Sequence, residues 1–329
     1  MPNKPLLDVA IHTLFAIMKF TKNTLNIAAL LKIKGIGNAW IMKHFQVDSS
    51  EAEIIECLAQ KYQNIESLFY ECKIAVENEF DSLENYADGI IAFCDDGFPT
   101  YSAKIKDSDK PTLLTYKGDL ELLTKNLLKI AVIGLLNPCD KIKELEEKIL
   151  DSMQDVVIVS GLAKGCDEIA HRFALKKGKA TIAILPSTLR NILPSANREL
   201  AQEIALNGGL LISEYITECD NPRFDLPQRY IERDRLQALF SDAVCLVASF
   251  SGIDSKKDKS KDSGVRHALG KAKEWGIARI APRGSENDER FNLNMEILCD
   301  KESQAIEINA GNIKGILERI RQSKMRSLC

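Results

Sequence analysis

One stretch of the sequence combines small residues and a lysine in an order that suits anion binding. Val156–Val159 is a β-branched run typical of a strand buried on both faces, and Ser160, Gly161, Lys164 and Gly165 follow it. A helix is expected to begin directly afterwards, so its positive end and free N–H groups point at this loop. The pattern therefore predicts a phosphate-binding turn between strand and helix. An ordinary tight connection is the alternative.

Two ionisable side chains lie on the helix that is expected to follow this loop. Asp167 and His171 are four residues apart and share one helix face. They are candidates for contacting a ligand or for acting as an acid–base pair. We favour a structural role, in which Asp167 supports the helix N-terminus and pairs with His171.

Further candidates come from later helices. Asn197 is placed either to cap the helix after it or to donate a hydrogen bond to a ligand. Arg233 shares a helix face with Arg229, and acidic residues lie nearby, so a surface ion-pair helix is one interpretation. Arginines clustered near a strand edge are also suited to phosphate contacts.

The elements that must position these residues alternate between strand and helix from residue 129 onward. Such alternation predicts an α/β fold with a mostly parallel sheet covered on both faces. Ligands bind beyond the carboxyl ends of the strands in this architecture. The predicted strands are Ile130–Gly134, Val156–Ser160, Thr181–Leu185, Leu210–Ser213, Ala243–Ala248, Ile277–Ala281 and Ala305–Ile308, and the edge residues include Gly134, Ser160 and Ser187.

We divide the chain into a helical domain over 1–88, an α/β domain over 89–310 and a C-terminal helix over 311–329. The first 20 residues have apolar side chains at helical spacing and predict a packed helix rather than a signal peptide. A Gly35-Ile36-Gly37 turn resembles a helix-hairpin-helix, although tight packing alone explains it. The polar run over 254–262 predicts a solvated loop.

Composition limits the function classes. The formal net charge is −3, so any polyanion must be held by a local basic patch. Nine dispersed cysteines without a CxxC pair suit a reducing cytoplasm and predict no metal site. The GxGxxG and Walker A patterns are absent from the sequence, so we expect neither a nicotinamide cofactor nor P-loop NTP hydrolysis.

The order of motifs resembles the DNA-processing protein A (DprA/Smf) family. The resemblance rests on VSGLAKGCDEIAH, on TIAILPSTLRNILPSANRELAQEI and on IERDRLQALFSDAVCLVAS, and it covers most of residues 90–282. It implies an extended Rossmann-like fold that binds single-stranded DNA without catalysis, as a homodimer. It also implies delivery of that DNA to a RecA-type recombinase in natural transformation or repair.

The resemblance also implies site residues. The DNA- and phosphate-binding candidates are Ser160, Gly161, Lys164, Gly165, Asn197, Arg233 and Arg235, and the further pocket candidates are Gly134, Asp167, His171, Ser187, Arg266 and His267. The sequence departs from the family pattern at Leu136, where an arginine is expected. We expect no catalytic residue, no cofactor and no membrane association.

Two other functions use the same fold. A sensor of a nucleotide-derived signal, for example in phage defence, would suit a reshaped pocket. A nucleoside-monophosphate phosphoribohydrolase is disfavoured, because Asp262–Arg266 lacks the Pro-Gly-Gly-x-Gly-Thr loop of those enzymes.

Overall fold

The computed structural model describes residues 18–47, 49–261, 264–285, 287–300 and 304–328. Within them a single nine-stranded sheet has the order β1-β2-β6-β5-β4-β3-β7-β8-β9. The strands are β1 (Gly89–Ala92), β2 (Leu113–Gly118), β3 (Leu128–Ile133), β4 (Val156–Ser160), β5 (Thr181–Ile184), β6 (Leu210–Ser213), β7 (Ala243–Leu246), β8 (Ala278–Pro282) and β9 (Ile306–Ile308). The predicted α/β fold and all the predicted strands are confirmed, and only strand ends shift.

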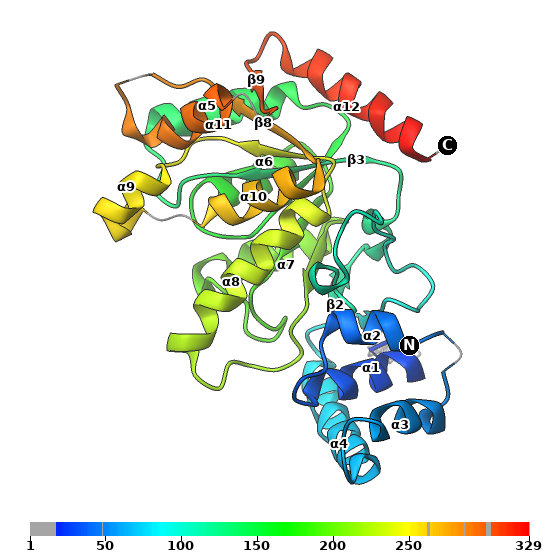
Figure 1. Cartoon of the computed structure of the whole chain (residues 1–329). Coiled ribbons are helices and arrows are strands. Elements are labelled where there is room, and N and C mark those ends of the chain that lie inside the picture. The colour runs from blue at the N-terminus through cyan, green and yellow to red at the C-terminus, as the bar shows by residue number, and fades with distance from the viewer. Residues whose placement is uncertain (1–17, 48, 262–263, 286, 301–303, 329) are drawn as a thin grey trace, which may run out of the picture.

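Helices cover both faces of the sheet because the central strands are apolar on both sides. Val157 and Val159 of β4 point into the core layer beneath α8 and α10, whereas Val156 and Ile158 point into the layer beneath α5, α6 and α12. The layers are visible in Figure 1. These helices are α5 (Asp140–Ser152), α6 (Cys166–Lys176), α8 (Pro222–Leu239), α10 (Val265–Trp275) and α12 (Ile313–Leu328), joined by α7 (Arg198–Leu206) and α11 (Asn292–Cys299).

The N-terminal helices pack at the antiparallel edge of the sheet. They are α1 (Lys22–Lys32), α2 (Asn38–His44), α3 (Glu51–Ala59) and α4 (Ile65–Leu83), and they form the blue and cyan body of Figure 1. They share one apolar core with α7 and the nearby strands. The helix predicted over the first 20 residues falls almost wholly in 1–17, outside the described residues. The domain boundaries after 88 and 310 remain predictions.

The Gly-Ile-Gly turn between α1 and α2 is present. Gly35 has a φ of +87°, a backbone conformation that favours glycine. The hydroxyl of Tyr62 donates a hydrogen bond to the Lys34 carbonyl at 2.9 Å and lies against the turn. Packing within the helical body therefore accounts for this glycine.

The polar run over 254–262 is not the loop that we predicted. Its first part belongs to helix α9 (Gly252–Lys257), and a short 3₁₀ turn follows over Lys259–Lys261. The cause is a capping box, in which Ser251 and Asp254 bond each other's backbone N–H groups. Asn292 also donates to the Asp254 carboxylate at 2.9 Å. The solvated-loop prediction is therefore wrong for 254–261, because local capping outweighs the lack of apolar residues.

A buried carboxyl between α5 and α6 gives the first testable expectation. Glu146 is fully buried, and the only polar side chain that contacts its carboxyl among the described residues is the weakly donating Cys166 thiol. Burial raises the pKa of Glu146 well above its usual value. The folded state therefore holds a proton that the unfolded chain releases above about pH 4.5, so the free energy of unfolding falls as the pH rises.

Replacing this carboxyl with an apolar side chain should stabilise the protein at alkaline pH. We expect Glu146→Met to raise the free energy of unfolding at pH 8 by about 1–3 kcal/mol, with a smaller gain at pH 5. Urea denaturation at the two pH values measures the difference. Glu147→Gln, at the exposed neighbouring position, is the matched control. Equal changes in the free energy of unfolding for Glu146→Met and Glu147→Gln would contradict a raised pKa of the buried Glu146 carboxyl.

Candidate anion-binding site

A pocket of about 680 Å³ lies where the carboxyl ends of β3 and β4 meet α8 and α10. Strand β3 pairs with β4 on one side and with β7 on the other. The strands that follow β3 in the chain are therefore added first on one side of it and then on the other, so the strand order reverses at this point. Open α/β sheets bind ligands at such a switch point. The predicted residues that line the pocket are Gly134, Lys164, Asp167, Arg233 and His267, and Leu136 lines it as well.

The loop after β4 is shaped by close backbone approach. Gly165 precedes α6 with a φ of +81°, and a Cβ atom there would collide with the carbonyl oxygens of Leu135 and Leu136. The Ser160 hydroxyl donates to the Val132 carbonyl at 2.6 Å. Glycine is therefore required at 165, and Ser160 joins β4 to β3. A direct phosphate contact by Ser160 stays a prediction.

Asp167 organises the loop from the start of α6. Its carboxylate accepts hydrogen bonds from the backbone N–H groups of Gly161 at 3.0 Å and Ala163 at 3.3 Å. A phosphate would have to compete with Asp167 for the Gly161 amide. Burial raises the pKa of Asp167, while the nearby Arg233 charge opposes this shift.

The predicted pair of Asp167 with His171 is wrong. His171 is fully buried, and its Nδ1 shares a hydrogen bond of 2.8 Å with the Thr181 hydroxyl at the start of β5. Burial, helped by the Arg233 charge, lowers the pKa of His171 to about 3. His171 is therefore a neutral core residue at physiological pH, and it does not line the pocket.

Arg233 lines the pocket from its buried side and connects two strand ends. Its side chain is 5 % exposed and donates to the carbonyl oxygens of Gly161 and Ile184, the latter at 3.1 Å. It also donates to Asp234 at 2.9 Å. Burial raises the pKa of Asp234 to about 6, against the effect of Arg233. The guanidinium thus compensates buried carboxylates and fixes the loop, and direct phosphate contact would require it to leave these bonds.

Arg235, Asn197 and Ser187 are among the predicted residues that do not line this pocket. Arg235 forms a bidentate ion pair with Glu214 at 2.6 and 2.7 Å and also donates to the Asp109 carbonyl. Asn197 is 1 % exposed and donates to the carbonyls of Leu162 and Ala163, so it supports the loop and does not cap α7. Ser187 is buried beside β6, where its carbonyl accepts from Ser213.

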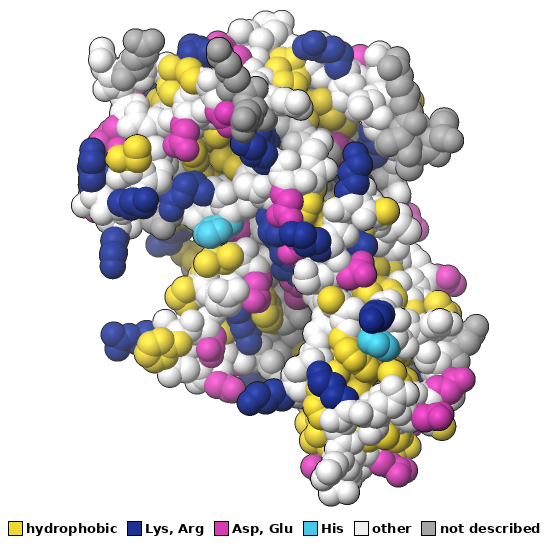
Figure 2. Space-filling view, in the orientation of Figure 1, with side chains coloured by type: hydrophobic (Ala, Val, Ile, Leu, Met, Phe, Trp, Pro, Cys, Tyr) yellow, Lys and Arg dark blue, Asp and Glu magenta, His cyan; other side chains and the backbone are white. Residues whose placement is uncertain are grey.

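The exposed positive charge of the site comes from Lys164 and from helix α9. Lys164 is exposed on the pocket wall. Arg266 next to His267 donates to Ser255 of α9 at 2.8 Å, which holds α9 beside the pocket. Lysines and arginines gather over α9 and α10 in Figure 2. The exposed lysines here are Lys256 and Lys257 of α9 and Lys259 of the 3₁₀ turn that follows it.

We did not predict this α9 contribution, because we expected a solvated loop over 254–262. Asp254 instead accepts the bonds of its capping box and is only 8 % exposed. The Ser-x-x-Asp spacing before the lysines was the signal available in the sequence.

The fold defines a Rossmann-like protein with a candidate anion-binding site at one edge of its sheet, and comparisons with known proteins give its family. Residues 89–252 match the family model described as DNA recombination-mediator protein A. The DNA processing protein DprA of Streptococcus pneumoniae is 40% identical over 137 residues, which cover 41% of this chain and 46% of the relative. Protein Smf of Borreliella burgdorferi is 32% identical, over 46% of this chain and 47% of the relative.

Two solved structures have the same fold. The X-ray structure of S. pneumoniae DprA superposes with a TM-score of 0.61 at 25% identity, over 84% of this chain and 96% of that one. The Helicobacter pylori DprA structure, described for its single-stranded DNA binding mode, gives 0.54 at 29% identity, over 68% and 93%. The chain belongs to the DprA/Smf family. Its matched segment spans about half the length of the curated relatives.

Proposed function

We propose that this protein binds single-stranded DNA in DNA processing and passes it to a RecA-type recombinase during natural transformation or repair. Family membership and the likeness to a structure described for single-stranded DNA binding support this function. The proposal includes a homodimer, a cytoplasmic location and a role without catalysis. Among the described residues, no helix is long and apolar enough to cross a membrane.

The observation that carries the proposal is an exposed lysine on a rigidly held loop. Lys164 projects from the loop whose two sides are fixed by Asp167 and Asn197, while Arg233 supports it from below. A loop held in this way loses little conformational entropy when Lys164 meets a phosphate. Lys164 and the lysines of α9 then provide the direct contacts, and the buried groups position them.

Contacts of this kind predict weak sequence preference and strong salt dependence. Fluorescence anisotropy with labelled mixed-sequence oligonucleotides should show an affinity that falls steeply between low and physiological salt, with a logarithmic slope of about −0.7 for each phosphate neutralised. An absence of binding at low salt would contradict the proposed function.

The recombinase and the dimer need separate experiments. Light scattering on the full chain should give twice the monomer mass. A pull-down with a purified RecA-type recombinase should recover a complex. A monomer mass would remove the homodimer from the proposal, and failure to recover the recombinase would remove that partner. DNA binding is judged independently by the anisotropy titration.

A further inference from the structure

A second cavity lies at the opposite, amino-terminal edge of the sheet. It has a volume of about 420 Å³ and is lined by residues between β1 and β2, before and at the start of β3, between the end of α8 and β7, and on α12. Lys129 is the second residue of β3 and lies at this edge, whereas the candidate anion-binding pocket lies at the carboxyl ends of the strands. The two sites are therefore separated by the length of the parallel strands.

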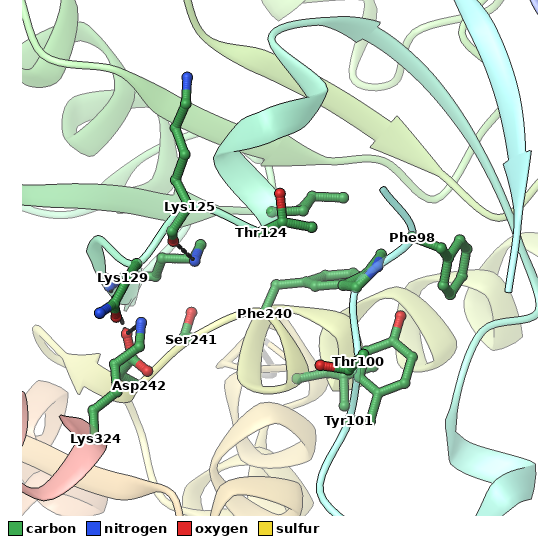
Figure 3. Close-up of a pocket in the computed structure, with 14 residues that line it drawn as sticks. Phe98, Thr100, Tyr101, Thr124, Lys125, Lys129, Phe240, Ser241, Asp242 and Lys324 are labelled. Carbon is green, nitrogen blue, oxygen red and sulfur yellow. Dashed lines mark hydrogen bonds and ion pairs between the residues drawn. The ribbon is translucent and has the colours of Figure 1, made fainter. Parts of the chain in front are cut away.

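The cavity has one apolar end and one cationic end. Phe98, Tyr101 and Phe240 form the apolar end, where their rings pack in edge or tilted arrangements with centroids 6.2 Å apart. Figure 3 shows the lysines and Asp242 at the other end, with Ser241 between the two groups. A ligand that fits both ends must combine an apolar body with a negative charge.

Two hydroxyl groups at this cavity have no hydrogen-bond partner within the described part of the chain. They are the Oγ of Ser241, a residue only 8 % exposed, and the phenolic oxygen of Tyr101. Buried hydroxyls are normally hydrogen-bonded, and leaving one unsatisfied destabilises the folded protein. A bound acceptor would remove this destabilisation.

The charges at the cationic end favour a ligand with a single negative charge. Lys125 is already paired with Asp119 and Glu121, each at 3.0 Å. Asp242 forms its ion pair with Lys324 at 2.9 Å, so the Lys129 ammonium has no ion pair of its own among the described residues and feels the Asp242 charge only from a distance. Lys129 is 7 % exposed and donates to the Lys125 carbonyl at 3.0 Å. Burial lowers the pKa of Lys129 to about 8, with a further contribution from Lys324.

We propose that this cavity binds a small organic acid whose single carboxylate meets Lys129 and Ser241 while its apolar body contacts Phe240 and Tyr101. The carboxylate accepts hydrogen bonds from the Lys129 ammonium and the orphaned Ser241 hydroxyl. One negative charge balances the ammonium, which disfavours a pyrophosphate.

Calorimetric titration of the full-length protein with phenylacetate tests this site. We expect phenylacetate to bind at least about tenfold more tightly than acetate, which lacks the apolar body, and than benzylamine, which carries the opposite charge. No heat of binding from phenylacetate at millimolar concentrations would overturn the proposal. Binding of inorganic phosphate in preference to phenylacetate would also overturn it.

Two substitutions assign the contacts. Lys129→Met should weaken phenylacetate binding by about tenfold or more, and Ser241→Ala by several-fold. Ser241→Ala removes one oxygen, so it tests the site even where Lys129→Met alters folding. Lys164→Glu, at the candidate anion-binding pocket on the other edge of the sheet, is the matched control and should leave phenylacetate affinity unchanged. Wild-type affinity in both cavity variants would refute the assignment.

Discussion

Replacing Lys164 with glutamate is expected to abolish single-stranded DNA binding without changing the stability of the fold. Lys164 is exposed on the pocket wall, so its substitution removes no core contact. The reversal deletes a charge-assisted hydrogen bond and adds repulsion against each phosphate. We expect an affinity loss of about 100-fold or more, since such bonds contribute roughly 1.5–3 kcal/mol before repulsion is added.

Lys176→Glu is the matched control for this experiment. Lys176 is exposed at the other end of α6, a helix about 16 Å long, and the screening length at physiological salt is about 8 Å. It should change DNA affinity by no more than about threefold, while both variants keep the wild-type thermal midpoint. Equal losses in the two variants would show that overall charge, not the Lys164 loop, determines binding.

Replacing Arg233 with glutamine is expected to produce a different result, a large loss of stability. The substitution leaves Asp234 and Asp167 buried without their compensating cation and breaks the bonds to Gly161 and Ile184. Breaking a buried ion pair in this way costs about 3–5 kcal/mol. Differential scanning calorimetry should therefore show a thermal midpoint lowered by several degrees.

A second substitution separates this positioning role from direct phosphate contact. Adding Asp234→Asn to Arg233→Gln removes one of the uncompensated charges and should recover a substantial part of the lost stability. Arg223→Gln, at an exposed position in the first turn of α8, should leave the thermal midpoint near wild type. If Arg233→Gln loses DNA affinity at full wild-type stability, Arg233 contacts the phosphate directly.

The framework of the fold was predictable because it follows from short-range patterns. The apolar runs at Ile130, Val156 and Ala243 mark strands buried on both faces, and the glycines after them mark turns. We did not predict helix α9, because it begins at a capping box formed by Ser251 and Asp254 and is stabilised by that local motif. A polar composition does not reveal which aspartate is already hydrogen-bonded.

The candidate site was predictable in its place but not in its internal bonds. Parallel alternation brings Gly134, Lys164 and Asp167 to one edge. The sequence does not show that Arg233 turns inward to Gly161 whereas Arg235 pairs with Glu214. Those choices depend on contacts between residues distant in sequence. The arginines therefore differ in burial and partner although they are two residues apart.

Hydrogen–deuterium exchange with and without an oligothymidylate tests the central claim most directly, because it locates the DNA on the intact chain. We predict slower exchange in peptides covering 161–167 and 252–261, the loop with Lys164 and the α9 segment. Peptides covering 98–101 and 239–242, at the other cavity, should be unchanged. Protection confined to the N-terminal helices, with none in the Lys164 loop, would contradict DNA binding at the Lys164 loop and α9.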